Sequence, residues 1–329
     1  MIKKAAIILL KICVSATLLY ILISRVGGRT IIYNISLLHP AAFLAAVALY
    51  FAGSYFSTLR WKLLVPFHSK TSRLFRIYMI GSFFNTYMPG IIGGDAVKAY
   101  YLNKELQSSE TLVQMQDNNE LASVIAIIAS VFMDRYIGLG ALLALGTAAF
   151  PFGISYLERA SLNWPVIWVV PAAAGVFIFA SLVIFVFRVG ERLKFLSTAY
   201  QYFRFYRKRK KIVLKAFLYS ILVQIFSILA VFVIARGLSL HISLLSLLIF
   251  LPIIVLFSAL PFSISGIGLR EGAFIFLLGS AGIPAEKSMT LSIIWFLSTF
   301  VAGLWGLLEY LRFKTIFGGD EKKETLQIP

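Results

Sequence analysis

Five charged residues lie inside stretches of sequence that are otherwise apolar: Asp95, Asp134, Arg135, Arg270 and Glu271. A charge within a bilayer is costly unless it is paired or hydrated, so each one is a candidate for a binding or transport role. Asp134 and Arg135 are neighbours on one expected helix and point in different directions, so they need separate partners. The economical assignment pairs Arg135 with Asp95 or Glu271, and Asp134 with Arg270.

Two breaks in the apolar pattern accompany these charges. Residues 88–95 read MPGIIGGD, and residues 260–271 read LPFSISGIGLRE. Proline removes a backbone donor, and glycine permits turns that other residues make only at a cost. Asp95 is expected to cap the helix that follows its break, and the freed N–H groups there, with Lys98 one turn along, suit a phosphate. The predicted substrate-binding and translocation residues are Asn85, Pro89, Gly93, Gly94, Asp95, Lys98, Asp134, Arg135, Pro261, Ser263, Ser265, Gly266, Gly268, Arg270 and Glu271.

The alternative interpretation of both breaks is structural. A capping Asp95 needs no ligand to explain it. Glycine and proline also help membrane helices to pack, and the buried charges could simply hold the broken segments to the rest of the bundle.

The composition places these residues in a membrane protein. The 329 residues are 60% hydrophobic and only 14% charged, with a mean hydropathy of +0.87, which is the profile of a polytopic membrane chain. The net charge of +17 fits basic loops on an anionic leaflet better than nucleic acid. The single cysteine, Cys13, excludes a disulfide framework, and the three histidines stand alone, so we predict no metal and no other cofactor.

Apolar windows of about 20 residues predict six full spans. The first is expected to be an uncleaved helix rather than a signal peptide, because Lys11 interrupts it and no cleavage site follows. The spans lie near residues 5–24, 41–62, 120–149, 164–187, 212–235 and 288–311. Irregular backbone cannot face lipid, so residues 75–102 and 243–283 are predicted to form re-entrant helical hairpins. The expected fold is a single all-α polytopic membrane domain over residues 1–329.

Charge placement predicts the orientation. With both termini inside, most of the 31 Lys and Arg residues face the cytoplasm, which favours the cytoplasmic (inner) membrane. They include Arg60, at the end of the second span, and those of residues 312–329, which form a tail. The order span, span, hairpin, span occurs in residues 5–149 and again in residues 164–311. Three crossings per half make these repeats inverted, so the hairpins enter from opposite faces and their tips approach near the midplane. Matched broken segments in inverted halves are typical of a transporter's binding site.

Two polar stretches lie outside the spans. Residues 202–211 read YFRFYRKRKK. Beside a span, this run is typical of an interfacial segment bound to anionic lipid rather than an RNA site. Residues 105–120 are expected to form a solvated cytoplasmic loop.

Three segments in combination resemble the lysylphosphatidylglycerol synthase transmembrane-region family, also called flippase-like or UPF0104 proteins. They are MPGIIGGDAVKAYYL, VFMDRYIGLGALL and LPFSISGIGLREGAF, and the likeness extends over about residues 5–312. The resemblance implies the flippase part of enzymes that make and translocate aminoacylated phosphatidylglycerol. Those enzymes carry an aminoacyltransferase domain after the membrane region, which is not expected within these 329 residues, so synthase activity is not implied.

The leading hypothesis is a lipid translocator that moves the headgroup of an anionic phospholipid, or of a polyprenyl-phosphate-linked sugar, across the cytoplasmic membrane. One alternative is an intramembrane enzyme on a lipid phosphate with Asp95 or Glu271 as acid or base. The sequence contains no convergent catalytic set, so we expect no enzyme. The other alternative is a non-transporting accessory protein of envelope lipid or glycan synthesis. The expected partners are membrane lipids and, potentially, the enzymes that synthesise envelope lipids.

Overall fold

The computed structural model describes residues 2–65, 67, 69–87, 93–108, 120–159, 168–186, 206, 209–260 and 263–324. All regular structure in these residues is helical, as the composition predicts. The predicted hairpin residues Pro89 and Pro261, much of the polar loop 105–120 and most of the basic run 202–211 lie outside the described residues.

Five helices are long and apolar enough to cross a membrane, and each coincides with a predicted span. They are α1 (Ile2–Val26), α3 (Pro40–Leu64), α6 (Glu120–Arg159), α11 (Lys210–Gly237) and α14 (Ala285–Glu324). The predicted span 164–187 corresponds to α8 (Val169–Val186), whose described apolar part is shorter, so a sixth crossing stays a prediction. The short α2 (Gly28–Ser36) lies between the first two predicted spans.

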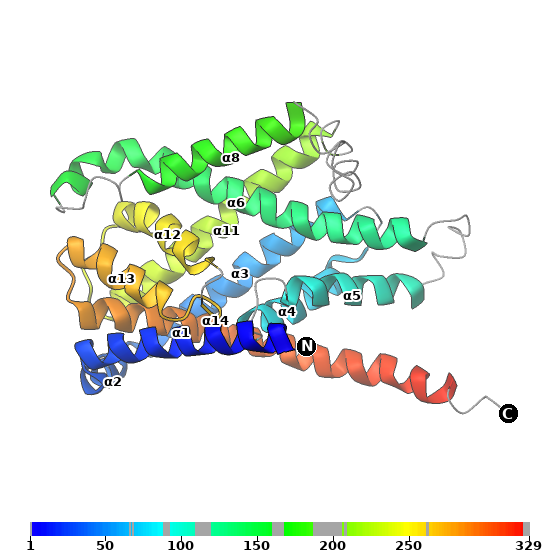
Figure 1. The fold of residues 1–329 in the computed structure, drawn as a ribbon, viewed down its shortest axis with the longest axis horizontal. Helices are drawn as coiled ribbons and strands as arrows, with labels where there is room; N and C mark the ends of the chain where they lie inside the picture. Colours follow the sequence, from blue (N-terminus) through cyan, green and yellow to red (C-terminus); the bar gives the residue numbers. More distant parts are fainter. Residues whose placement is uncertain are drawn as a thin grey trace.

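Each predicted hairpin is a pair of short helices with a break between them. The first pair is α4 (Thr71–Tyr87) and α5 (Gly93–Ser108), and the second is α12 (Leu244–Ser258) and α13 (Leu269–Ser280). The α4–α5 pair lies towards one end of the long axis and the α12–α13 pair towards the other, with both breaks near the middle (Figure 1). Re-entry from opposite membrane faces, and inversion of the two repeats, stay predictions.

Separate apolar clusters surround the two broken pairs. One joins α12 and α13 to α6, α8, α11 and α14, with Phe250 and Phe274 fully buried. The other packs α4 and α5 against the ends of α3, α6 and α14, around Trp61. Helices α3 and α11 pack along each other, with the Phe56 and Phe226 rings stacked at 5.5 Å. The polar site lies where the two broken pairs meet.

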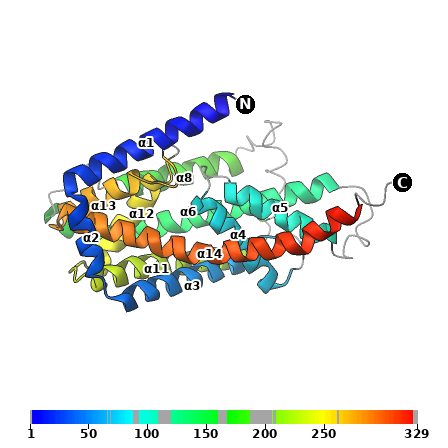
Figure 2. The ribbon, with the colours of Figure 1, turned by 90° about the horizontal axis from the view of Figure 1, so that it is seen from below.

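Helix α1 lies at the edge of this bundle, beside α13 (Figure 2). Among its residues from Leu9 onward, only Ser15 is buried. Between Lys11 and Arg25 its sequence is mainly apolar, as expected of a helix that faces lipid on most sides.

Candidate functional site

The second break contacts the end of α4, the helix that precedes the first break. The Ser265 hydroxyl, in the turn before α13, donates a hydrogen bond to the carbonyl oxygen of Thr86 at 3.2 Å, near the end of α4. The following Gly266 has a φ of +76°, and a Cβ there would lie 2.9 Å from the Ser258 side chain. Only glycine accepts both conditions without strain. The predicted approach of the two hairpin tips stays a prediction, because residues 88–92 of the first break lie outside the described residues.

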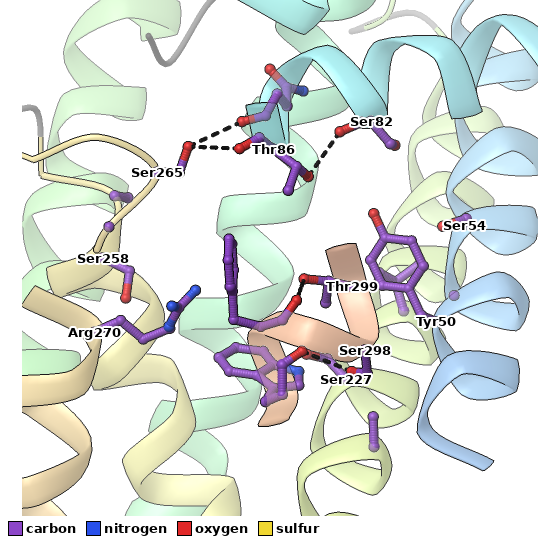
Figure 3. A pocket seen from close by; sticks show the side chains of 18 of the residues that line it. Tyr50, Ser54, Ser82, Thr86, Ser227, Ser258, Ser265, Arg270, Ser298 and Thr299 are labelled. Carbon is purple, nitrogen blue, oxygen red and sulfur yellow. Dashed lines mark hydrogen bonds between the residues drawn. The ribbon is translucent and has the colours of Figure 1, made fainter. Parts of the chain in front are cut away.

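A cavity of about 480 Å³ opens beside this contact. It is lined by α1, α3, α4, α6, α11, α12, the turn before α13, and α14, so it draws on both halves of the chain. Hydroxyl groups dominate its polar lining (Figure 3). They belong to Tyr50, Ser54, Ser57, Tyr78, Ser82, Thr86, Ser227, Ser258, Ser263, Ser265, Ser298 and Thr299. Five of these hydroxyls already donate to backbone carbonyl oxygens: Thr86, Ser258, Ser265, Ser298 and Thr299. The hydroxyls whose protons are not used in this way can donate to phosphate or sugar oxygens, and every hydroxyl oxygen can accept from a sugar hydroxyl.

Three basic side chains line the cavity: Lys11, Arg135 and Arg270. No Asp or Glu occurs among its lining residues in the described part of the chain. Lys11 forms no ion pair with any described residue, and the Arg135 side chain is 55% exposed. The cavity therefore presents positive charge and hydroxyl donors, a combination that suits an anionic group.

Arg135 is held by Asp95 through two hydrogen bonds, from Nε at 2.8 Å and from Nη2 at 3.0 Å. This confirms one of the two partners predicted for Arg135. Asp95 also pairs with Lys98, whose Nζ is 3.1 Å from Oδ1. Lys98 is 2% exposed and lies over the rings of Trp61 and Tyr78. Asp95 is thus paired with a cation on each side.

Asp134 does not pair with Arg270, so that prediction was wrong. Its Oδ1 accepts a hydrogen bond from Nε of Arg60 at 2.6 Å, and its Oδ2 is 3.9 Å from Nζ of Lys98. Both members of the Arg60–Asp134 pair are almost fully buried. The sequence analysis had assigned Arg60, at the end of a span, to the cytoplasmic segments. Three cations and two carboxylates thus form a chain, with Arg135 at its cavity end.

Arg270 pairs instead with its neighbour Glu271. Its Nε and Nη2 donate to Glu271 Oε1 at 3.0 and 2.5 Å. Glu271 is further held by the backbone N–H of Gly268 at 2.6 Å and by the hydroxyl of Ser292 at 3.1 Å. Arg270 also lies over the Phe296 ring, 4.5 Å from its centroid. Neighbouring residues on a helix usually point in different directions. The long, flexible Arg270 side chain nevertheless bends to the carboxylate of the next residue, a pairing that helical spacing does not predict.

Gly94 of the first break packs against protein rather than lining the cavity. The N–H of Gly94 donates to Asn85 Oδ1 at 3.1 Å, and a Cβ on Gly94 would lie 2.0 Å from the Gly81 carbonyl oxygen. Asp95 lies in the first turn of α5, and among the described residues its side chain pairs with Arg135 and Lys98. Asn85 thus takes the role that the sequence analysis gave to Asp95.

The predicted site residues fall into three groups. Those that line the cavity are Asn85, Arg135, Ser263, Ser265, Gly266 and Arg270. Those beside it, in the two charge clusters or the turns, are Gly93, Gly94, Asp95, Lys98, Asp134, Gly268 and Glu271. Pro89 and Pro261 lie outside the described residues.

Sequence reasoning missed Lys11, Arg60 and most of the hydroxyl groups. Lys11 interrupts the first apolar span, and that interruption was a usable signal. The serines of α3, α11 and α14 gave no signal of a role in a binding site, because hydroxyl side chains are common in membrane helices as packing and hydrogen-bonding groups.

Comparison with known proteins adds a family. The family profile described as the lysylphosphatidylglycerol synthase TM region matches residues 8–306 of the chain. The match covers both broken pairs and every residue that lines the cavity. No curated protein matches the chain.

Proposed function

This chain belongs to the lysylphosphatidylglycerol synthase transmembrane-region family, and from that membership and its cavity we propose that it is a flippase-like lipid translocator. The substrate is a lipid with an anionic headgroup: a phospholipid, or a polyprenyl phosphate that carries a sugar. The observation that supports this most directly is the cavity with three basic residues and a hydroxyl wall where the two broken helix pairs meet. The protein acts in the cytoplasmic membrane, and the proposal includes no chemical step.

The ion pairs around the cavity favour exchange of a carboxylate for a phosphate. Removing one partner from a buried ion pair costs about 3–5 kcal/mol, because the other charge is left unpaired. Asp95 keeps Lys98 if Arg135 turns away. Glu271 keeps the N–H of Gly268 and the Ser292 hydroxyl if Arg270 does the same. Each arginine can therefore bind a phosphate, with two parallel hydrogen bonds, without leaving a bare carboxylate behind.

The two breaks supply the route. We propose that α4–α5 and α12–α13 are re-entrant hairpins from opposite faces, so that the cavity beside their tips is reachable from either leaflet in turn. The headgroup passes through this polar cavity while the hydrocarbon chains stay outside the bundle. Such a path removes the main barrier to lipid exchange, which is the burial of a charged headgroup in hydrocarbon.

Reconstituted vesicles test this function. The purified protein is placed in liposomes with traces of fluorescent phosphatidylglycerol, lysylphosphatidylglycerol or a polyprenyl phosphate, and the accessibility of each lipid is followed with time. Wild-type protein should accelerate exchange of at least one of them over empty vesicles. Arg270→Gln should lower that rate at least tenfold, because it removes a cavity cation while Glu271 keeps its other donors.

The matched control is Arg236→Gln at the end of α11. Arg236 is exposed and lies over the Phe232 ring, away from the cavity, so the rate should not change. If wild type and empty vesicles exchange every lipid at the same rate, the translocator proposal is wrong and an accessory role is favoured.

A further inference from the structure

An apolar groove of about 390 Å³ lies between α1, α12 and α13. Every residue that lines it is apolar, with Leu18 and Leu22 on α1 facing Phe257 on α12 and Phe276 on α13. Its α13 side includes Gly268, Gly272 and Ala273. Gly272 leaves room that the α1 side chains do not fill, because a Cβ added there would meet no atom within 4 Å.

The groove lies next to the polar cavity on the same elements. Helix α1 contributes Lys11 to the cavity and Leu18 to the groove, and the α12 end contributes Ser258 to the cavity and Phe257 to the groove. Lys11 and Leu18 are seven residues apart, which is about 10 Å along a helix. This distance is similar to the distance between the phosphate of a lipid and the first methylene groups of its hydrocarbon chain.

Helix α1 crosses the turn before α13 between the two sites. The Ser15 hydroxyl accepts a hydrogen bond from the Ile264 N–H at 2.9 Å. The Leu18 Cβ would lie 2.7 Å from a Cβ at Gly268. These two contacts hold an otherwise peripheral helix (Figure 2). An apolar space open beside a cationic cavity fits one amphiphile, with its anion in the cavity and its chain in the groove.

We propose that this groove binds a hydrocarbon chain of the lipid whose anionic headgroup enters the cavity. This inference rests on the proposed function and adds to it the place where the substrate's chain leaves the protein. The bound group is a long acyl or isoprenoid chain attached to a phosphate. The groove selects for length and flexibility, while the cavity residues select for charge.

Photocrosslinking in reconstituted vesicles tests the groove. The probes are phosphatidylglycerol with a diazirine in one acyl chain, a polyprenyl phosphate with a diazirine in its isoprenoid chain, and phosphatidylcholine with the same acyl chain as the first. Labelled positions are read by mass spectrometry. At least one anionic probe should label the peptides of α1 and α13 around Leu18 and Gly272 at least fivefold more than phosphatidylcholine does. The probe that does so identifies the chain type.

Two glycine variants on one helix separate filling of the groove from a general effect on α13. Gly272→Leu should reduce labelling to the level of phosphatidylcholine and lower the exchange rate at least fivefold. Gly279→Leu is the control, because a Cβ there also meets no atom within 4 Å but the position lies outside the groove. It should change neither labelling nor rate. Arg270→Gln should also reduce anionic labelling, because the headgroup no longer anchors the chain.

The possible results separate the two proposals. Equal labelling by all three probes, unaffected by Gly272→Leu and Arg270→Gln, would mean that the groove holds boundary lipid only, which overturns this inference. If the wild type still exchanges lipid in that case, the proposed function stands. Headgroup-dependent labelling without exchange would support the groove and refute transport.

Discussion

The buried pair of Arg60 and Asp134 should be the strongest polar link between α3 and α6. Their side chains are 6% and 1% exposed, and Nε lies 2.6 Å from Oδ1. Asp134→Ala leaves Arg60 with only the Ser220 hydroxyl, at 3.1 Å. Loss of one partner from such a pair costs about 3–5 kcal/mol, so we expect a decrease of about 3 kcal/mol in the free energy of unfolding.

A double-mutant cycle isolates the pair. Arg60→Ala alone should cost somewhat less, because Lys98 still lies 3.9 Å from Asp134 Oδ2. The double variant should recover about 2 kcal/mol relative to the sum of the single variants, since neither charge is then left alone. That coupling exceeds the ~0.6 kcal/mol average measured between polar groups of membrane helices, because here both groups are charged and buried.

The assay is equilibrium unfolding in mixed micelles with increasing denaturing detergent, followed by tryptophan fluorescence. The control cycle combines Asp134→Ala with Arg270→Ala, the pair that sequence reasoning had suggested. Since the two side chains share no contact with each other, their effects should add within about 0.5 kcal/mol. If the Arg60 cycle is additive and the Arg270 cycle is not, the described charge network is wrong.

Two further predictions concern the first broken pair. Gly94→Ala should lower the free energy of unfolding by about 1–3 kcal/mol, because its Cβ would overlap the Gly81 carbonyl oxygen. The control Gly175→Ala meets nothing within 4 Å and should be neutral or slightly stabilising in the same unfolding assay. In a cysteine-free background, single cysteines at Ser69 and Ser109 should both react with an impermeant thiol reagent from the cytoplasm. If the two cysteines react from opposite sides of the membrane, residues 75–102 form a full crossing and the re-entrant hairpin is wrong.

The sequence alone was sufficient for the class of protein and for most helix positions. A run such as residues 41–62 predicts a spanning helix from length and hydropathy, and the structure has α3 over Pro40–Leu64. The two breaks were equally visible, because proline and glycine act on the backbone locally. These features depend on a short window of residues, so no knowledge of the packing was needed.

The pairing of charges was only partly predictable. Arg135 and Asp95 were matched correctly, because few partners were available inside the apolar segments. Arg60 was placed with the cytoplasmic segments because it stands near the end of its span, yet α3 packs so that the residue is 5% exposed and reaches Asp134. The burial of a residue near a helix end depends on the neighbouring helices rather than on its own sequence.

The cavity itself was decided by tertiary structure. Tyr50, Ser82, Ser227 and Thr299 come from four helices in both halves of the chain and face one space (Figure 3). Each of these residues is unremarkable within its own apolar helix, where a hydroxyl can bond to the preceding turn, as Thr299 does with the Phe296 carbonyl. Only the way in which the helices pack turns these separate hydroxyls into one wall, because packing determines which face of each helix meets the others.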